Sequence, residues 1–174
     1  MQRSRLVIFC ATLLLCFFAV AGAAEWKEYK PEGSRCSLSL PKAPALSAKN
    51  VDTDSGPIEM HQVLADFGEY AYLMTYNDYP LSLINEKGSE KILADVVSGS
   101  VGDGELITKR DITFGLYPGR EYVCKKQGLY LKARVYLIKH RLYQMIAAYP
   151  PAQADVLSTD IETFLSSFRL IASE

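Results

Sequence analysis

The histidines of this 174-residue chain are His61 and His140, and a serine nucleophile of the Ser-His-Asp type needs a histidine within hydrogen-bond reach. We expect His140 at the tip of a β-hairpin, which holds a general base poorly. We expect His61 at the edge of an apolar stripe, where most histidines are packed and hydrogen-bonded. Segment 98–102 lacks the first glycine of a nucleophile elbow and follows an expected helix instead of a strand. A hydrolase-type enzyme is therefore the least favoured function.

Motifs for metals and cofactors are missing from the sequence. The chain contains no HExxH, no CxxC and no clustered His, Cys and Asp set, and it contains no GxGxxG or GxxxxGKS/T phosphate loop. The segment from Asp52 resembles the start of a calcium loop, but its sixth and twelfth positions are Pro57 and Val63 in place of glycine and glutamate. We therefore expect no cofactor, no metal site and no catalytic residue.

Two other sets of side chains are candidates for recognition or for holding the fold together. Glu121 and Arg134 are expected to face each other across two antiparallel strands, where a charged pair is ordinarily structural. Tyrosine combines apolar area with a polar tip, so a group of tyrosines suits a recognition surface. The candidate group either lines a groove or simply covers the sheet, and it comprises Tyr70, Tyr72, Tyr76 and Tyr79.

The first 24 residues have the pattern of a secretory signal peptide. Arg3 and Arg5 precede an apolar run over residues 6–20, and residues 21–24 are the small residues that a signal peptidase requires. The alternative is an uncleaved membrane anchor, although the run is shorter than the ~20 residues that cross a bilayer. We expect export through the general secretory route to the periplasm or the extracellular space, and one domain over residues 25–174.

Charge argues against nucleic acid as a partner. Removal of Arg3 and Arg5 leaves 17 of the 19 Lys and Arg residues against 20 Asp and Glu residues. The basic residues are scattered and form no run, whereas a nucleic-acid binder shows a basic face.

Cys36 and Cys124 remain after removal of the leader. An oxidising compartment permits a disulfide between them, and this pair is the disulfide candidate of the chain. Both residues also lie in apolar segments, where an unpaired cysteine is a common small core residue. The sequence leaves both outcomes open.

Alternation of apolar and polar residues predicts strands over most of the mature chain. The expected strands cover residues 36–40, 58–67, 70–79, 105–114, 120–126, 129–139 and 142–149, and residues 45–57 are expected to form a polar loop. Two-residue turns at Gly68-Glu69, Gln127-Gly128 and His140-Arg141 connect antiparallel neighbours. These turns place His61 opposite Tyr76, Glu121 opposite Arg134, Val135 opposite Ile146 and Tyr136 opposite Met145.

Two helices are expected to cover this sheet. One lies between residues 82 and 100, and the other carries a helical stripe that comprises Leu157, Ile161, Phe164, Leu165 and Phe168. Because both faces of the hairpin over residues 129–149 are apolar, the sheet must be covered on two sides. The sequence therefore predicts an α+β fold, in which an antiparallel sheet of about six or seven strands is packed by two main helices in an αβα sandwich. The sheet would combine an N-terminal strand, a hairpin and a C-terminal meander.

Several short motifs carry a family resemblance. They are Trp26, Leu38-x-Leu40-Pro41-x-x-Pro44, Asp78-Tyr79-Pro80, Arg134-x-Tyr136, Arg141-Leu142-Tyr143 and Phe164-Leu165-x-x-Phe168. Together they resemble small exported bacterial proteins of the PsbP-like superfamily. That superfamily is an αβα sandwich named for an extrinsic subunit of photosystem II and shared with a Ran-binding nuclear-import factor. The matching residues are strand ends, turns and core positions, so the resemblance implies a fold and brings no catalytic residue with it.

From the residues and the resemblance we expect a non-enzymatic exported domain. Its expected partner is another envelope or secreted protein, which it binds or whose complex it assists. The alternative is a carrier of a small ligand with a tyrosine-lined pocket between helix and sheet. An exposed apolar or tyrosine patch would favour the partner, and a concave pocket would favour the ligand.

Overall fold

The computed structural model describes residues 25–53 and 56–171. The expected signal peptide of residues 1–24 lies outside the described residues and stays a prediction. None of the helices that the structure describes is long and apolar enough to cross a bilayer.

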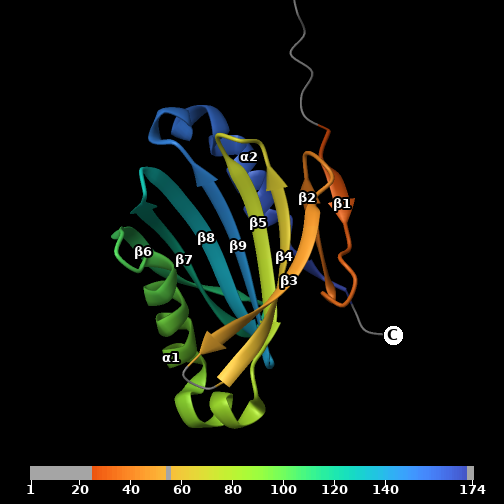
Figure 1. The fold of residues 1–174 in the computed structure, drawn as a ribbon, viewed down its shortest axis with the longest axis vertical. Coiled ribbons are helices and arrows are strands. Elements are labelled where there is room, and N and C mark those ends of the chain that lie inside the picture. Colours follow the sequence, from red (N-terminus) through yellow and green to blue (C-terminus); the bar gives the residue numbers. More distant parts are fainter. Residues whose placement is uncertain (1–24, 54–55, 172–174) are drawn as a thin grey trace, which may run out of the picture.

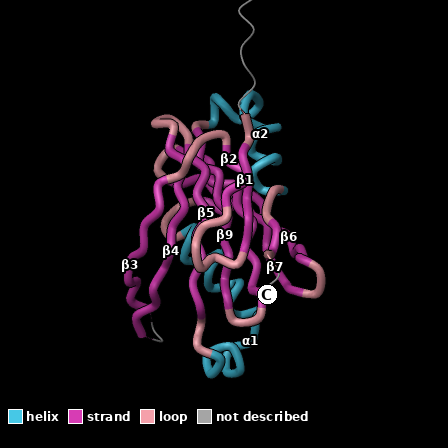
Figure 2. The backbone as a smooth tube through the Cα atoms, turned by 90° about the vertical axis from the view of Figure 1, so that its right-hand side faces the viewer, coloured by secondary structure: helices cyan, strands magenta, loops and turns pink. Residues whose placement is uncertain are grey.

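A seven-stranded antiparallel sheet forms the centre of the molecule (Figure 1), with the strand order β3-β4-β5-β9-β8-β7-β6. Its strands are β3 (Ala45–Thr53), β4 (Gly56–Asp66), β5 (Ala71–Asp78), β6 (Glu105–Phe114), β7 (Tyr117–Lys126), β8 (Leu129–Ile138) and β9 (Arg141–Tyr149). A second, three-stranded sheet contains β1 (Lys27–Tyr29), β2 (Cys36–Leu40) and β10 (Arg169–Leu170). Figure 2 shows β3 at one margin of the main sheet and β6 at the other.

Helix α2 (Ala154–Ser166), which follows a single 3-10 turn (Pro151–Gln153), covers one face of the main sheet together with the small sheet. Its predicted stripe is buried, and Phe168, just beyond the helix, is buried as well at 2% exposure. The stripe packs on aromatic and apolar side chains of β5, β8 and β9, such as Tyr72 and Met145. Burial of each large side chain contributes about 1.5–3 kcal/mol, which makes this face the main core.

Helix α1 (Leu81–Val101) covers the opposite face. Ile92, Leu93 and Val97 pack on β7 and β8, where Tyr122 and Val135 are buried. The helix bends at Gly88, whose φ of 74° is outside the helical region and suits glycine. The αβα sandwich predicted from the sequence is therefore confirmed.

Two parts of the predicted sheet differ from the structure. Residues 45–53 form edge strand β3 instead of a polar loop, with Ala45 paired to Leu64. The side chains of residues 45–50 are exposed, so this edge strand lacks the apolar alternation that identifies strands in a sequence. The strand forms because its backbone pairs with β4. The predicted first strand exists as β2, but it pairs with β1 and β10 in the small sheet.

Two of the three predicted hairpin registers are confirmed, and the third is shifted by two residues. His61 lies opposite Tyr76, and Glu121 lies opposite Arg134. The last turn is formed by residues 139 and 140, because Lys139 adopts the left-handed conformation (φ 58°) and the residue after His140 already belongs to β9. Val135 therefore faces Gln144 instead of Ile146, and Tyr136 faces Tyr143 instead of Met145. A shift of two leaves every side chain on its predicted face.

Candidate functional site

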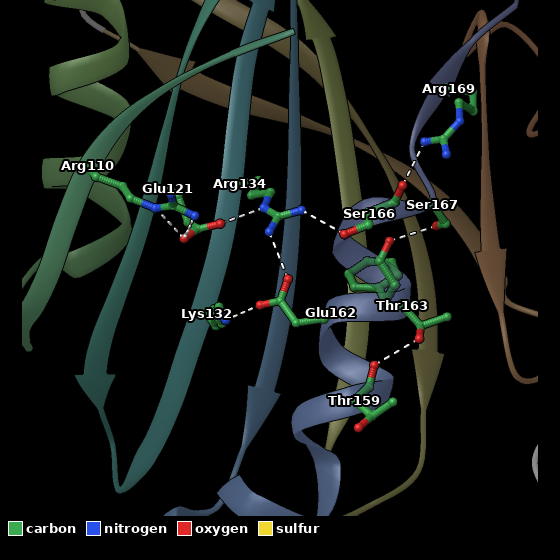
Figure 3. Close-up of polar contacts among 11 residues, drawn as sticks. Arg110, Glu121, Lys132, Arg134, Thr159, Glu162, Thr163, Ser166, Ser167 and Arg169 are labelled. Carbon is green, nitrogen blue, oxygen red and sulfur yellow. Dashed lines mark hydrogen bonds and ion pairs between the residues drawn. The ribbon is translucent and has the colours of Figure 1, made fainter.

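The predicted ion pair of Glu121 and Arg134 forms the centre of a larger network (Figure 3). Arg134 Nε donates a hydrogen bond of 2.6 Å to Glu121 Oε2, and Arg110 Nε donates one of 2.8 Å to Glu121 Oε1. Burial by itself raises the pKa of Glu121, but the hydrogen bonds from Arg134 and Arg110 outweigh it and hold that pKa below its ordinary value. Glu121 is therefore a charged acceptor, which does not suit a general acid.

The network continues from the sheet to helix α2. Arg134 donates 2.8 Å and 3.1 Å hydrogen bonds to Glu162 Oε2 and Ser166 Oγ, and Lys132 pairs with the other oxygen of Glu162. Each carboxylate and each guanidinium of this network has a partner. The arrangement thus locks β6, β7 and β8 to α2, which is a structural role.

A second polar cluster, which the sequence did not reveal, joins the small sheet to the main one. Arg141 donates hydrogen bonds of 2.6 Å and 2.7 Å to the two carboxylate oxygens of Asp78, and it also reaches the Gly33 carbonyl. The hydrogen bond from Arg141 lowers the pKa of Asp78. Both side chains belong to motifs of the family resemblance, and that was the available signal for them. A bidentate Arg–carboxylate pair fixes geometry well, so the cluster anchors the loop before β2.

Neither histidine occupies a catalytic arrangement. His61 stacks on Tyr76 with ring centroids 4.6 Å apart, and His140 Nε2 lies 3.7 Å from Asp78 Oδ1. Among the described side chains, those of residues 25–51 and 56–171, no hydrogen bond joins either histidine to a serine, threonine or cysteine. Over the same residues, no group of three His, Cys, Asp or Glu side chains is placed to hold a metal ion.

The four candidate tyrosines do not form one surface. Tyr72 and Tyr76 are 1% and 4% exposed in the core beneath α2, and Tyr70 packs at the edge of that core. Tyr79 lies on the opposite face, against the cluster beneath α1. Tyr70, Tyr72 and Tyr76 therefore help to cover one face of the sheet, whereas Tyr79 lies on the other face, so the four side chains do not line one groove.

The disulfide candidate is not formed. Cys36 and Cys124 are free and fully buried. Cys36 belongs to the core beneath α2 and Cys124 to the core beneath α1, so the main sheet separates them. Burial raises the pKa of both thiols, which makes them unreactive core residues.

The margin of the sheet at β6 is open to solvent. β6 is exposed over most of its length, and none of the described strands pairs with its outer side. Leu106 and Ile107 are 43% and 46% exposed, and Leu116 in the turn between β6 and β7 is 99% exposed. The sequence predicted strand β6 but not its position, which depends on the strand order.

A cavity of about 360 Å³ lies between α1 and strands β3, β4, β5 and β9. Its polar lining comes from Thr75, Asn77, Ser100 and Gln144, and its apolar lining includes Met60. The antiparallel register of β5 and β9 places Thr75 and Gln144 directly opposite each other. The cavity meets the sequence-based criterion for a pocket between helix and sheet, although only one candidate tyrosine, Tyr79, lines it.

Comparison with known proteins supports the fold of this chain and assigns it no specific function. No family model and no curated protein matches this chain. The solution structure of cyanobacterial PsbP (CyanoP) from Synechocystis sp. PCC 6803 is similar, with a TM-score of 0.57 and 15% identity over 87% of this chain and 95% of that one. A protein of unknown function from Pseudomonas aeruginosa, PA94, described as a putative regulator, has a TM-score of 0.39 and 11% identity over 78% of this chain and 90% of that one. With its layers and strand order in view, the similarity to CyanoP identifies the fold of this chain as PsbP-like.

Proposed function

We propose that this protein is an exported, non-enzymatic accessory domain that binds another envelope or secreted protein through the edge formed by β6 and the turn to β7. The observation that carries the proposal is Leu116, which is 99% exposed at the tip of this edge. The PsbP-like fold and the predicted leader agree with an accessory role outside the cytoplasm. We call residues 105–117 the open edge.

Leu116 is not needed to make the turn in which it lies. Phe114 pairs with Tyr117, so Gly115 and Leu116 form a two-residue connection, and Gly115 supplies the positive φ of 59° that such turns require. A polar residue would fit the second position equally well. Burial of Leu116 against a partner would contribute about 1.5–3 kcal/mol of binding free energy, whereas in the isolated protein this side chain stays in solvent.

The open edge is held rigidly enough to bind without a large ordering cost. Phe114 stacks edge-on against Tyr136 and Phe168, with centroids 5.7 Å and 5.2 Å away. Arg110 of β6 is tied to Glu121 of β7. Preorganised strands lose little freedom on binding, so more of the contact free energy appears as affinity.

The backbone of β6 suits an extended partner segment. A strand at the margin of a sheet presents unpaired N–H and C=O groups that a second chain can use. The register is irregular between Leu106 and Thr108 and regular from Thr108 to Phe114. We place the partner strand along this regular part, with an apolar side chain next to Leu116.

The non-enzymatic part of the proposal is supported by how the ionisable groups are used. Glu121 and Glu162 both accept hydrogen bonds from Arg134. Asp78 accepts hydrogen bonds from Arg141 in the same way. Acid–base catalysis needs a titrating group within reach of substrate, and these groups are held by partners of opposite charge.

The test is affinity purification of the exported form from its native envelope fraction, followed by reconstitution with the purified partner. Leu116→Asp should weaken binding at least about tenfold, because a charged side chain replaces the apolar anchor. The matched control is Val156→Asp on α2, since Val156 is also highly exposed (82%) but lies away from the open edge. Equal affinity of the two variants would show that the open edge is not the interface.

A further inference from the structure

We propose that the cavity between α1 and strands β3, β4, β5 and β9 binds a small neutral molecule that is mostly apolar and carries one hydrogen-bond donor. The site is separate from the open edge, so the inference goes beyond the proposed function. Three features of the cavity support it, namely its shape, its buried polar groups and its lack of charge.

The cavity exists because α1 covers only part of its face of the sheet. The helix packs on β7 and β8, while the same face of β4 and β5 continues beyond it (Figure 1). The space of about 360 Å³ lies within the range of sites for small molecules. Its apolar walls are Val51, Ile58, Met60, Val96 and Leu142.

Three uncharged polar side chains converge on this space from the floor of the sheet. Thr75, Asn77 and Gln144 are only 5%, 7% and 9% exposed. They occupy inward positions of the central strands β5 and β9, where apolar side chains would pack against a helix without cost. Asn77 bonds to Tyr79, and Gln144 bonds to Tyr122 and Ser100. The polar groups that remain face the open cavity, where a ligand can contact them.

The orientation of Gln144 defines what the ligand must supply. Gln144 Nε2 donates hydrogen bonds of 2.6 Å to Tyr122 OH and 2.8 Å to Ser100 Oγ, which uses both of its amide hydrogens. Within the described part of the chain, the hydrogen bonds of the Gln144 side chain are the two that its Nε2 donates, and neither Gln144 Oε1 nor the Thr75 hydroxyl is a fully buried atom without a partner, so both are accessible from the cavity. The facing pair therefore offers an acceptor and a hydroxyl to a ligand with an O–H or N–H group.

The cavity lining excludes charged ligands. The lining residues include no Lys, Arg, His, Asp or Glu. An ion that entered would lose its hydration without meeting an opposite charge. A neutral ligand loses little, since one polar group can be satisfied by Thr75 and Gln144 while the apolar walls contact the remainder.

Gly99 lines the cavity without a side chain and so leaves space at one wall. It lies inside α1, where glycine is less favourable than alanine. A Cβ added at this position would meet no atom within 4 Å. A larger side chain here would therefore extend into free space at the cavity wall without disturbing the helix.

The experiment uses 2-naphthol, a neutral bicyclic probe with one O–H donor, with 2-methoxynaphthalene and 2-naphthoate as probes that lack the donor or carry a charge. Binding is followed by titration calorimetry and by amide chemical-shift mapping on the purified exported form. We expect saturable binding of 2-naphthol at concentrations up to about 1 mM, and at least about tenfold weaker binding of the other two probes. The shifts should centre on Thr75 and Gln144.

Three variants decide the interpretation. Thr75→Val should weaken 2-naphthol binding about tenfold, whereas Thr159→Val, the same change at an exposed position of α2, should leave it unchanged. Gly99→Leu should abolish binding while the protein stays folded, because it narrows the cavity without touching the polar cluster. Absence of saturable binding, preference for 2-naphthoate, or full binding by Gly99→Leu would each overturn the proposal. A loss of 2-naphthol binding leaves partner capture at the open edge untouched, so the two proposals fail separately.

Discussion

Tyr72 and Tyr143 lie in the same core beneath α2, and they differ in what their hydroxyl groups contact. Tyr143 OH donates a 2.8 Å hydrogen bond to the Ser34 carbonyl. Tyr72 OH is buried and finds no hydrogen-bond partner among the described residues. Burial raises the pKa of both phenols, that of Tyr143 to about 12, so both hydroxyls are neutral at physiological pH. Removal of each hydroxyl by substitution with phenylalanine therefore tests opposite expectations.

The two substitutions should shift the free energy of unfolding in opposite directions. An unsatisfied buried polar group costs about 1–3 kcal/mol, so Tyr72→Phe should stabilise the protein by about 1 kcal/mol after loss of some dispersion contacts. Tyr143→Phe removes a hydrogen bond and leaves the Ser34 carbonyl without this donor, which should destabilise by about 1–3 kcal/mol. The ring packing is unchanged in both variants, so the contrast isolates the hydroxyl.

The assay is urea unfolding followed by circular dichroism, with thermal unfolding as a second measurement. For a chain of this size, 1 kcal/mol corresponds to about 2–4 °C in Tm. We expect Tm to rise for Tyr72→Phe and to fall for Tyr143→Phe. If Tyr72→Phe destabilises the protein as much as Tyr143→Phe does, the Tyr72 hydroxyl has a partner and the reasoning fails.

Three further outcomes are expected from the contacts of individual residues. Hydrogen bonds from arginine lower the folded-state pKa of Glu121, so ionised Glu121 stabilises the folded protein above the unfolded pKa of about 4.3, and this stabilisation is lost as pH falls. Glu121→Gln should therefore lower the free energy of unfolding by about 2 kcal/mol at pH 7 and by much less at pH 3, as measured by urea unfolding at both values. A Cβ on Gly119 would lie 2.4 Å from a ring atom of the facing tyrosine of β8, so Gly119→Ala should destabilise by about 1–3 kcal/mol, while Gly99→Ala, which meets nothing, should leave Tm equal or higher. In protein that lacks residues 1–24, Cys36 and Cys124 should react with a thiol reagent only after denaturation. If no thiol can be titrated after unfolding, the two cysteines form a disulfide instead.

Much of the fold follows from short-range signals in the sequence. The turn at Gly68-Glu69 sets the pairing of His61 with Tyr76, and the turn at Gln127-Gly128 sets that of Glu121 with Arg134. In each case, the turn and the side-chain alternation are local, so the facing residues can be counted outward from the turn. The last hairpin shows the limit, because a left-handed Lys139 moved the turn by one residue and the pairing by two.

Other features depend on which segments pair in the assembled sheets. β3 pairs with β4 although its outward residues give no apolar pattern, and β2 leaves the main sheet to pair with β1 and β10. Strand order decides that β6 is an open margin. These outcomes depend on pairings between segments with little local preference, and the free energy of the assembled layers selects among them.

The sequence by itself determined the α+β class, the two helices, two hairpin registers and the facing of Glu121 and Arg134, because each depends on periodicity or on one tight turn. Only the tertiary structure decided that Arg110 and Glu162 join that pair, that the cysteines are separated by the sheet, and that Thr75 and Gln144 face a cavity beneath α1. The physical reason is that side chains from different elements meet according to how the layers pack. No local pattern in the chain encodes that packing.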